Sequence, residues 1–152
     1  MMQTARLPAA SSSAWATRAG NFHIDGRRAE GGFDPHQTVP VILDAGCGWG
    51  ITGIWCAKHW DANVTSMDAD PAVFPYLEAV AKLNGVSTTP WVQRFEKVRK
   101  QDLENVDILF GGDICFWDDL VKPVGQMINR AIDAGVGTIV IGDPERPTFH
   151  EM

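Results

Sequence analysis

Residues 41–50 read VILDAGCGWG, and this stretch decides the fold class. It begins with a short apolar run of the kind that forms a buried strand. Gly46, Gly48 and Gly50 follow at alternate positions, where they let the backbone bend tightly and approach a ligand closely. Residues 51–60 then have helical spacing, and the free N–H groups of that helix would point at the ligand. A tight turn that needs glycine only for its own geometry is the alternative interpretation.

The rest of the chain alternates between short apolar runs and helical patterns. Strands are expected over residues 39–43, 63–67, 91–95, 106–110 and 136–141, and helices over 51–60, 70–83 and 118–134. Asp70 is expected to cap the second helix, and Asp118 or Asp119 the third. This alternation predicts an α/β fold, a doubly wound, mostly parallel sheet of about five strands with helices on both faces. Ligands of such sheets bind beyond the carboxyl ends of the strands.

Composition narrows the class of protein. The chain has 152 residues, which fits one domain, and its net charge of -6 does not favour a nucleic-acid partner. Three cysteines form no zinc-binding pattern, and their odd number argues against a disulfide framework, so a reducing, cytoplasmic location is expected. The four histidines are scattered, so no metal site is predicted. The sequence has no apolar run long enough to cross a bilayer, and no membrane association is expected.

The domain organisation follows from the hydrophobic periodicity, which becomes clear only from about residue 39 onward. Residues 1–37 have no clear period and are rich in Ala, Ser and Gly, so a flexible N-terminal tail or approach segment is expected there. Its acid-poor, Ser- and Arg-bearing start faintly resembles an organellar transit peptide, although a disordered tail is the better interpretation. Residues 38–152 are predicted to form the ligand-binding core.

Two acidic residues follow the first two predicted strands. Asp44 precedes the first glycine, where a carboxylate can accept hydrogen bonds or face an ammonium group. Asp68 ends the second strand, where a carboxylate can bind both hydroxyls of a ribose. A nicotinamide-dependent oxidoreductase is the rival hypothesis, because residues 48–53 also fit the pattern G-x-G-x-x-G. Asp44 is awkward beside a pyrophosphate, however, and the only tyrosine, Tyr76, lies inside a predicted helix.

With these motifs in place, the chain resembles a known family. Residues 43–50, LDAGCGWG, are similar to the first motif of class I, Rossmann-like S-adenosylmethionine-dependent methyltransferases. The segments 112–116, GDICF, and 141–147, IGDPERP, resemble the seven-strand protein-lysine methyltransferases. Within these, the resemblance is closest to the branch that includes electron-transfer-flavoprotein β-subunit lysine methyltransferase. It covers about residues 39–147 and implies methyl transfer from S-adenosylmethionine to an amine.

The resemblance also implies roles for particular residues. A first group would bind the methionine end of the cofactor: Asp44, Gly46, Cys47 and Gly48. Asp68, with its neighbour Ala69, would hold the ribose, and Phe95 and Glu96 would lie near the adenine.

On the acceptor side, Asp113 matches the acid that opens the family's D-x-x-Y motif beside the target amine, and is the expected catalytic residue. This sequence has Phe116 where that motif carries tyrosine. A helix cap is the structural alternative for Asp113. Trp49 and Trp117 are candidate pocket walls or packing residues, and Arg146 is a candidate for a substrate contact or a surface ion pair.

The partners are predicted from the same resemblance. The methyl acceptor is expected to be a protein lysine or a small-molecule amine, and a catalytically silent cofactor-binding module is a further alternative. Class I methyltransferases usually continue beyond the fifth strand into a helix and two more strands, the last of them antiparallel. This chain ends at Met152, so those strands are expected to be missing. The open edge beside the fifth strand then suggests a homodimer.

Overall fold

The computed structural model describes residues 2–5, 39–144 and 147. Within them, six strands form one sheet in the order β1-β6-β5-β2-β3-β4. The strands are β1 (Met2–Ala5), β2 (Val41–Ala45), β3 (Asn63–Asp68), β4 (Thr89–Val92), β5 (Ile108–Gly112) and β6 (Thr138–Gly142). Most of the expected tail, residues 1 and 6–37, lies outside the described residues, as do Glu145 and Arg146.

Five of these strands, β2 to β6, are parallel to one another, which confirms the predicted doubly wound α/β fold. The central strand β2 pairs with β3 on one side and with β5 on the other. All five predicted strands exist, although four of them begin or end a few residues from the expected positions. The third shows the largest difference, because β4 begins at Thr89 and ends before Phe95.

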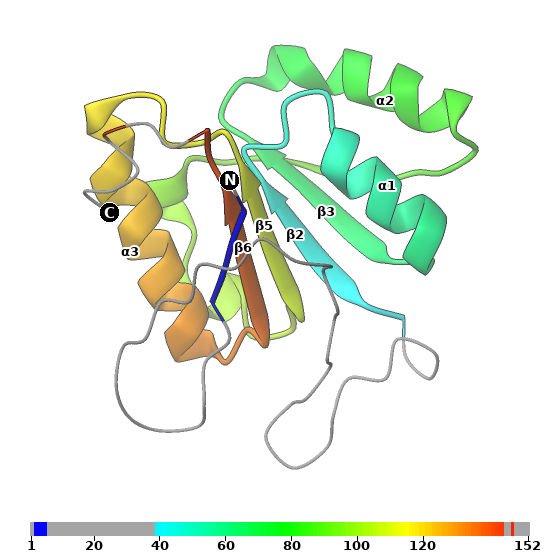
Figure 1. The fold of residues 1–152 in the computed structure, drawn as a ribbon. Helices are drawn as coiled ribbons and strands as arrows, with labels where there is room; N and C mark the ends of the chain where they lie inside the picture. The colour runs from blue at the N-terminus through cyan, green and yellow to red at the C-terminus, as the bar shows by residue number, and fades with distance from the viewer. Residues whose placement is uncertain (1, 6–38, 145–146, 148–152) are drawn as a thin grey trace.

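Helices cover both faces of the sheet (Figure 1). They are α1 (Ile51–Trp60), α2 (Phe74–Leu83) and α3 (Asp118–Ala134), with short 3-10 turns η1 (Pro71–Val73), η2 (Phe95–Lys97) and η3 (Lys100–Asp102). Strand side chains alternate between the faces. One set packs with α3 and comprises Leu43, Met67, Leu109 and Ile141. The other packs with α1 and comprises Ile42, Val64, Ile108 and Val140. This double coverage explains why the strands read as continuous apolar runs.

The helix caps agree only in part with the sequence prediction. Asp70 caps the first turn as expected, since its carboxylate accepts a hydrogen bond from the Ala72 N–H at 2.9 Å. The prediction that Asp118 or Asp119 caps the third helix is wrong. Trp117 is the residue at that position, without a side-chain hydrogen bond, and both acids lie inside the first turn. There they favour the helix through its dipole instead.

The strand β1 was not predicted from the sequence. It pairs antiparallel with β6, with Met2 opposite Gly142 and Ala5 opposite Ile139. The chain's own N-terminal residues therefore occupy the edge that we expected to be open. The premise of the homodimer prediction is thus wrong, while the oligomeric state itself stays a prediction. None of the helices among the described residues has the length and apolar character needed to span a membrane.

Candidate cofactor and acceptor site

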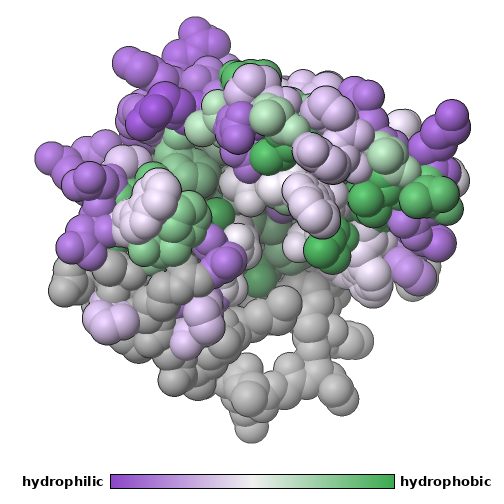
Figure 2. All heavy atoms as spheres, turned by 90° about the horizontal axis from the view of Figure 1, so that it is seen from above, coloured by the Kyte–Doolittle hydropathy of each residue, from purple (hydrophilic) through white to green (hydrophobic). Residues whose placement is uncertain are grey.

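The candidate site lies where the chain changes direction across the sheet. From β2 it passes through α1 to β3 on one side, and later it returns to β5 on the other side. Such switch points leave a crevice beyond the carboxyl ends of the strands. Figure 2 looks down on this edge, where apolar residues lie in the middle of the face and hydrophilic residues form much of its rim.

The glycine-rich turn between β2 and α1 is held against the end of β3 by its backbone. The N–H groups of Gly46 and Cys47 both donate to the Met67 carbonyl, at 2.8 and 2.9 Å. Gly46, Gly48 and Gly50 all have positive φ angles, of 70°, 52° and 76°. Few other residues adopt this conformation readily, which explains why glycines occur at alternate positions.

The Asp44 carboxylate lies beneath this turn and is 3% exposed. Its Oδ2 accepts a hydrogen bond of 3.0 Å from the Gly53 N–H at the start of α1. Burial raises the pKa of Asp44 to about 6, and the charge of Asp68 adds to this, while the Gly53 hydrogen bond opposes it. Among the described residues, no lysine or arginine forms an ion pair with Asp44 or Asp68. A cationic ligand would therefore be favoured here.

The Asp68 carboxylate connects the end of β3 to the turn. Its Oδ2 accepts from the Gly48 N–H at 3.0 Å, and its Oδ1 accepts from the Asp70 N–H at 3.0 Å. The structure thus brings together the two acids that the sequence singled out, on neighbouring strands and on either side of the glycine turn. Ala69 follows Asp68 and is exposed on the same edge.

The glycines of this region have different surroundings. A Cβ added to Gly46 would lie 2.5 Å from Ile114 Cγ2 and 3.3 Å from Phe95 Cζ. A Cβ added to Gly48 would meet no heavy atom within 4 Å, so the space beside that residue is open. Gly53 packs against β2 and β3, because its Cβ would lie 2.9 Å from both Asp44 Oδ2 and Val64 Cγ1. Close helix–strand packing therefore explains the third glycine of the G-x-G-x-x-G match.

Phe95 and Glu96 lie in η2, which follows β4. The Phe95 ring is partly buried against the core beside Gly46. Its carbonyl accepts a hydrogen bond of 2.8 Å from Arg130 Nη2, so α3 holds the turn in place. The Glu96 carboxylate instead pairs with Arg94 Nε at 2.6 Å. This hydrogen bond lowers the pKa of Glu96.

Asp113 follows β5 and is exposed at the carboxyl edge of the sheet. Its φ angle is 60°, in the left-handed region that aspartate visits only in special contexts. Its N–H donates to the Gly142 carbonyl at 2.7 Å, which joins the end of β5 to the end of β6. Phe110, the β-sheet partner of Asp44, lies three residues before Asp113. The predicted acceptor acid is therefore on the strand next to the cofactor turn.

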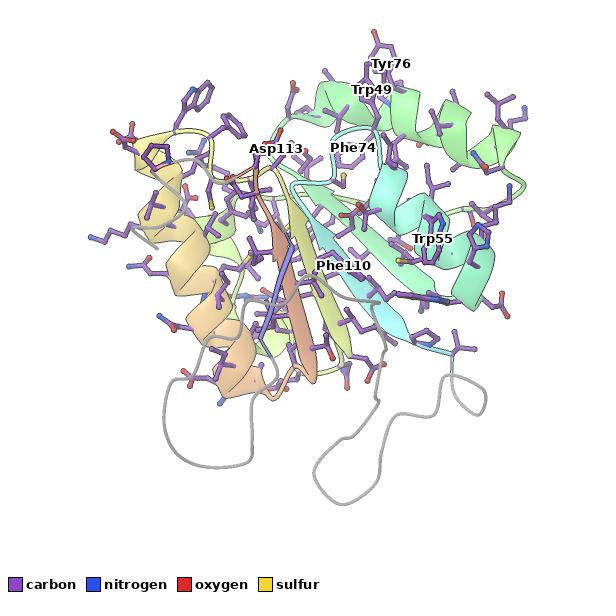
Figure 3. The ribbon with its side chains drawn as sticks, viewed as in Figure 1. Trp49, Trp55, Phe74, Tyr76, Phe110 and Asp113 are labelled. Carbon is purple, nitrogen blue, oxygen red and sulfur yellow. The ribbon has the colours of Figure 1, made fainter. Side chains whose placement is uncertain are left out.

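Aromatic residues lie on both sides of this edge. Trp49 stacks on Tyr76 of α2, with ring centroids 5.6 Å apart. Figure 3 shows this pair above α2, and Asp113 across the glycine turn from it. Phe116 and Trp117 form an edge-to-face pair at 4.7 Å, and they are 46% and 66% exposed. Trp49 and Trp117 are therefore surface residues rather than core residues.

The thiol of Cys47 lies within the turn but is not activated. Burial raises its pKa to about 12, and the charges of Asp44 and Asp68 contribute. The residue therefore carries a neutral thiol at physiological pH, which excludes a thiolate nucleophile there. The described residues include no group of three or more side chains that could hold a metal ion.

Comparison with known proteins assigns the chain to a family. Residues 42–135, more than half of the chain, match the family described as "Methyltransferase domain". The chain belongs to this methyltransferase domain family. It has the class I, S-adenosylmethionine-dependent form of the domain. The match starts in β2 and ends at the close of α3, so it contains the glycine turn, both acids and Asp113.

Two relatives illustrate the distance to characterised proteins. The methyltransferase domain is similar to the electron transfer flavoprotein beta subunit lysine methyltransferase of Rattus norvegicus, with 28% identity over 108 residues. That alignment covers 71% of this chain and 42% of the relative. The Danio rerio protein of the same name is 24% identical over 110 residues, covering 72% and 42%. The chain thus spans about two fifths of the length of these relatives.

Solved structures share the fold. A TehB-like SAM-dependent methyltransferase from Corynebacterium glutamicum superposes with a TM-score of 0.54 and 22% identity, covering 73% of this chain and 61% of that one. Monomeric WbdD gives a TM-score of 0.54 at 16% identity, covering 72% and 28%. At these identities the likeness concerns the architecture alone.

Sequence reasoning missed two residues of this site. Ile114 is buried between the glycine turn and β5, and its apolar side chain gave no signal beyond core packing. Tyr76 was placed inside a helix without a role, although it stacks on Trp49 of the turn. A spacing argument could have found Tyr76, because it lies in the first turn of α2, the helix that follows the end of β3.

Proposed function

We propose that this methyltransferase domain binds S-adenosylmethionine over the glycine turn and transfers the methyl group to an amine, with a protein lysine as the first candidate acceptor. The observation that carries the proposal is the pair of carboxylates, Asp44 and Asp68, on either side of the turn. They have backbone N–H partners but no cationic partner among the described residues. A ligand that carries an ammonium group and a sulfonium group supplies the missing positive charge.

The residues present fit that ligand. The methionine end would lie against Asp44, Gly46, Cys47 and Gly48, where the open space beside Gly48 admits a close approach to the backbone. On the ribose side, Asp68 and Ala69 follow β3, and the Asp68 carboxylate would exchange its Gly48 partner for ribose hydroxyls.

The adenine would lie near η2. The Phe95 ring is the better candidate for contact, because it packs beside Gly46 and is anchored through its carbonyl by Arg130. Glu96 would first have to release Arg94.

The chemistry requires little of the protein beyond positioning. When bound, the cofactor supplies a methyl group that its sulfonium already activates. Asp113 would orient the acceptor amine and accept one of its protons, directly or through water, as the N–C bond forms and the S–C bond breaks. Alignment of this kind can supply on the order of 7–11 kcal/mol of the barrier reduction.

The acceptor class is supported by charge and by relationship. Asp113, Asp118 and Asp119 place acids around the acceptor side of the edge, which favours a cationic acceptor side chain. The relatives described above are lysine methyltransferases by name. Because the chain spans about two fifths of their length, the flavoprotein subunit is a candidate acceptor to be tested.

A calorimetric titration with S-adenosylhomocysteine tests the cofactor site. We expect Asp68→Asn to weaken binding by at least about tenfold, since a ribose contact to a charged group would be lost. The matched control is Asp70→Asn, which changes a neighbouring exposed acid that caps η1, and we expect less than about a twofold effect. A folded wild-type chain that binds NAD and not S-adenosylhomocysteine would overturn the proposal.

A labelling assay tests the acceptor. The wild-type chain is incubated with methyl-tritiated S-adenosylmethionine and either the electron transfer flavoprotein beta subunit or free L-lysine. We expect Asp113→Asn to lower transfer by about tenfold or more while S-adenosylhomocysteine affinity stays within about twofold. Asp133→Asn is the control, because Asp133 is an exposed acid near the other end of α3, and it should transfer at the wild-type rate. Equal rates of methyl transfer in Asp113→Asn and in the wild type would show that Asp113 takes no part in the chemistry.

A further inference from the structure

We propose that Ile114 is a positioning residue that fixes the acceptor carboxylate, Asp113, relative to the cofactor turn. The inference rests on the function proposed above. Ile114 is 3% exposed, and its neighbour Cys115 is fully buried, whereas Asp113 and Phe116 on either side of them are exposed. The loop after β5 is therefore anchored by its two middle residues and presents its outer residues to solvent.

Ile114 contacts two glycines, one in the turn after β2 and one in β5. Its Cγ2 lies 2.5 Å from the position that a Cβ of Gly46 would take, in the cofactor turn after β2. Its Cδ1 lies 2.5 Å from the corresponding position at Gly111, in β5. No residue other than glycine fits at either place without a shift, because real Cβ atoms do not approach other atoms so closely. Ile114 thus fills a space that both glycines leave open.

The packing of Ile114 helps to hold the backbone conformation of Asp113. The backbone of Asp113 is held at a φ angle of 60°, which costs about 1–2 kcal/mol for a residue with a side chain. Only surrounding contacts can maintain such a conformation. Two contacts support the backbone on either side of Asp113. Its own N–H donates a hydrogen bond to the Gly142 carbonyl, and the side chain of the next residue, Ile114, packs against Gly46 and Gly111.

The cofactor turn has supports of its own. Its N–H groups bond to the Met67 carbonyl and the Asp68 carboxylate, and neither bond involves Ile114. A change at residue 114 should therefore displace the acceptor loop, residues 113–116 after β5, and leave cofactor binding largely intact. A loss of methyl transfer without a loss of cofactor affinity distinguishes a positioning role from general core packing.

The two branches of the side chain allow a sharp test. Ile114→Val keeps the Cγ2 methyl that faces Gly46 and loses only Cδ1. Ile114→Leu removes the methyl branch at Cβ and so loses the Gly46 contact. Ile128→Leu is the matched control, because Ile128 is also 3% exposed and belongs to the same core cluster, but it lies on α3.

Single-turnover methyl transfer to the acceptor protein of the labelling assay, at saturating cofactor, is the first measurement. We expect Ile114→Leu to lower the rate by roughly 10- to 100-fold, since a misplacement of about 1 Å can reduce a rate by about 100-fold. The dissociation constant of S-adenosylhomocysteine should change by less than about threefold. Ile114→Val and Ile128→Leu should transfer at rates near that of the wild type. Equal loss in Ile114→Leu and Ile128→Leu, or wild-type transfer by Ile114→Leu, would overturn the proposal.

Hydrogen exchange of the Asp113 amide is the second measurement and needs no turnover. It should become about tenfold faster in Ile114→Leu and stay unchanged in Ile114→Val and Ile128→Leu. If the wild-type chain transfers no methyl group, the proposed function fails, and the exchange rates still decide whether Ile114 holds the loop. An unchanged hydrogen-exchange rate of the Asp113 amide in Ile114→Leu would show that Ile114 does not hold the loop.

Discussion

The cofactor turn after β2 and the acceptor loop after β5 solve the same geometric problem differently. Both need backbone with positive φ at the carboxyl edge of the sheet. The cofactor turn uses Gly46, Gly48 and Gly50 for this purpose, while the acceptor loop uses Asp113. The turn is relaxed because its residues with positive φ have no Cβ, whereas the loop is strained at Asp113, whose side chain we propose for the chemistry. Strain at such a place is common in functional sites.

The largest effect should come from crowding the cofactor turn. Gly46→Ala places a Cβ at positive φ and 2.5 Å from Ile114 Cγ2, so we expect it to lower the free energy of unfolding by roughly 2–5 kcal/mol. Gly48→Ala is the control with positive φ and open space, and should cost about 1–2 kcal/mol. Urea denaturation measures both, and equal losses would show that crowding by Ile114 is unimportant.

The next effect is a pH dependence located beneath the turn. Burial raises the pKa of Asp44 to about 6, so ionisation of its carboxyl weakens the folded state. Its contribution to stability is complete below about pH 4 and is lost as the pH rises through 6. Between pH 4 and pH 7, the wild type should therefore lose about 2–3 kcal/mol relative to Asp44→Asn.

Urea denaturation of both proteins across this range checks the prediction, since other carboxylates contribute equally to the two curves. Asp44→Asn should also bind S-adenosylmethionine more weakly at pH 7, because the charge that faces the ligand is gone. Parallel stability curves would mean that Asp44 is not desolvated in the folded protein.

A smaller effect, of opposite sign to that of Gly46→Ala, is expected in the acceptor loop. Asp113→Gly relieves about 1–2 kcal/mol of backbone strain and loses part of this gain to the greater freedom of the unfolded chain. We expect the free energy of unfolding to rise by up to about 1 kcal/mol while methyl transfer falls. Thermal or urea unfolding would measure the gain in stability, and the labelling assay would measure the loss of methyl transfer. A destabilised glycine variant would contradict the strain argument.

The smallest effect is expected at Glu96. Its carboxylate pairs with Arg94 at 2.6 Å on the surface, and exposed ion pairs contribute less than about 1 kcal/mol. Glu96→Gln should change the affinity for S-adenosylhomocysteine by less than about twofold. Phe95→Ala, changed at the adjacent position, should weaken binding more, because its ring lines the turn. A tenfold loss in Glu96→Gln would instead place this carboxylate on the adenosyl group.

The two regions also differ in how far they could be predicted. The cofactor turn was found from local spacing, because glycines and the acid before them occupy fixed positions along a strand–turn–helix unit. Asp113 was predicted as the acceptor acid only through a family resemblance, since nothing in residues 112–116 marks Asp113 as strained. The helix caps show the same limit, because Asp118 and Asp119 are residue types that suit a cap, yet they lie one and two positions after the cap residue, Trp117.

The sequence by itself determined the order of strands and helices, the doubly wound class and the residues at the carboxyl edge, because each depends on periodicity within one element. The tertiary structure decided the contacts that cross elements. It placed Asp68 on the Gly48 amide, Ile114 between Gly46 and Gly111, and β1 on the edge of β6. Such contacts join residues far apart in the chain, and no local pattern encodes which pairs the packing of the sheet brings together.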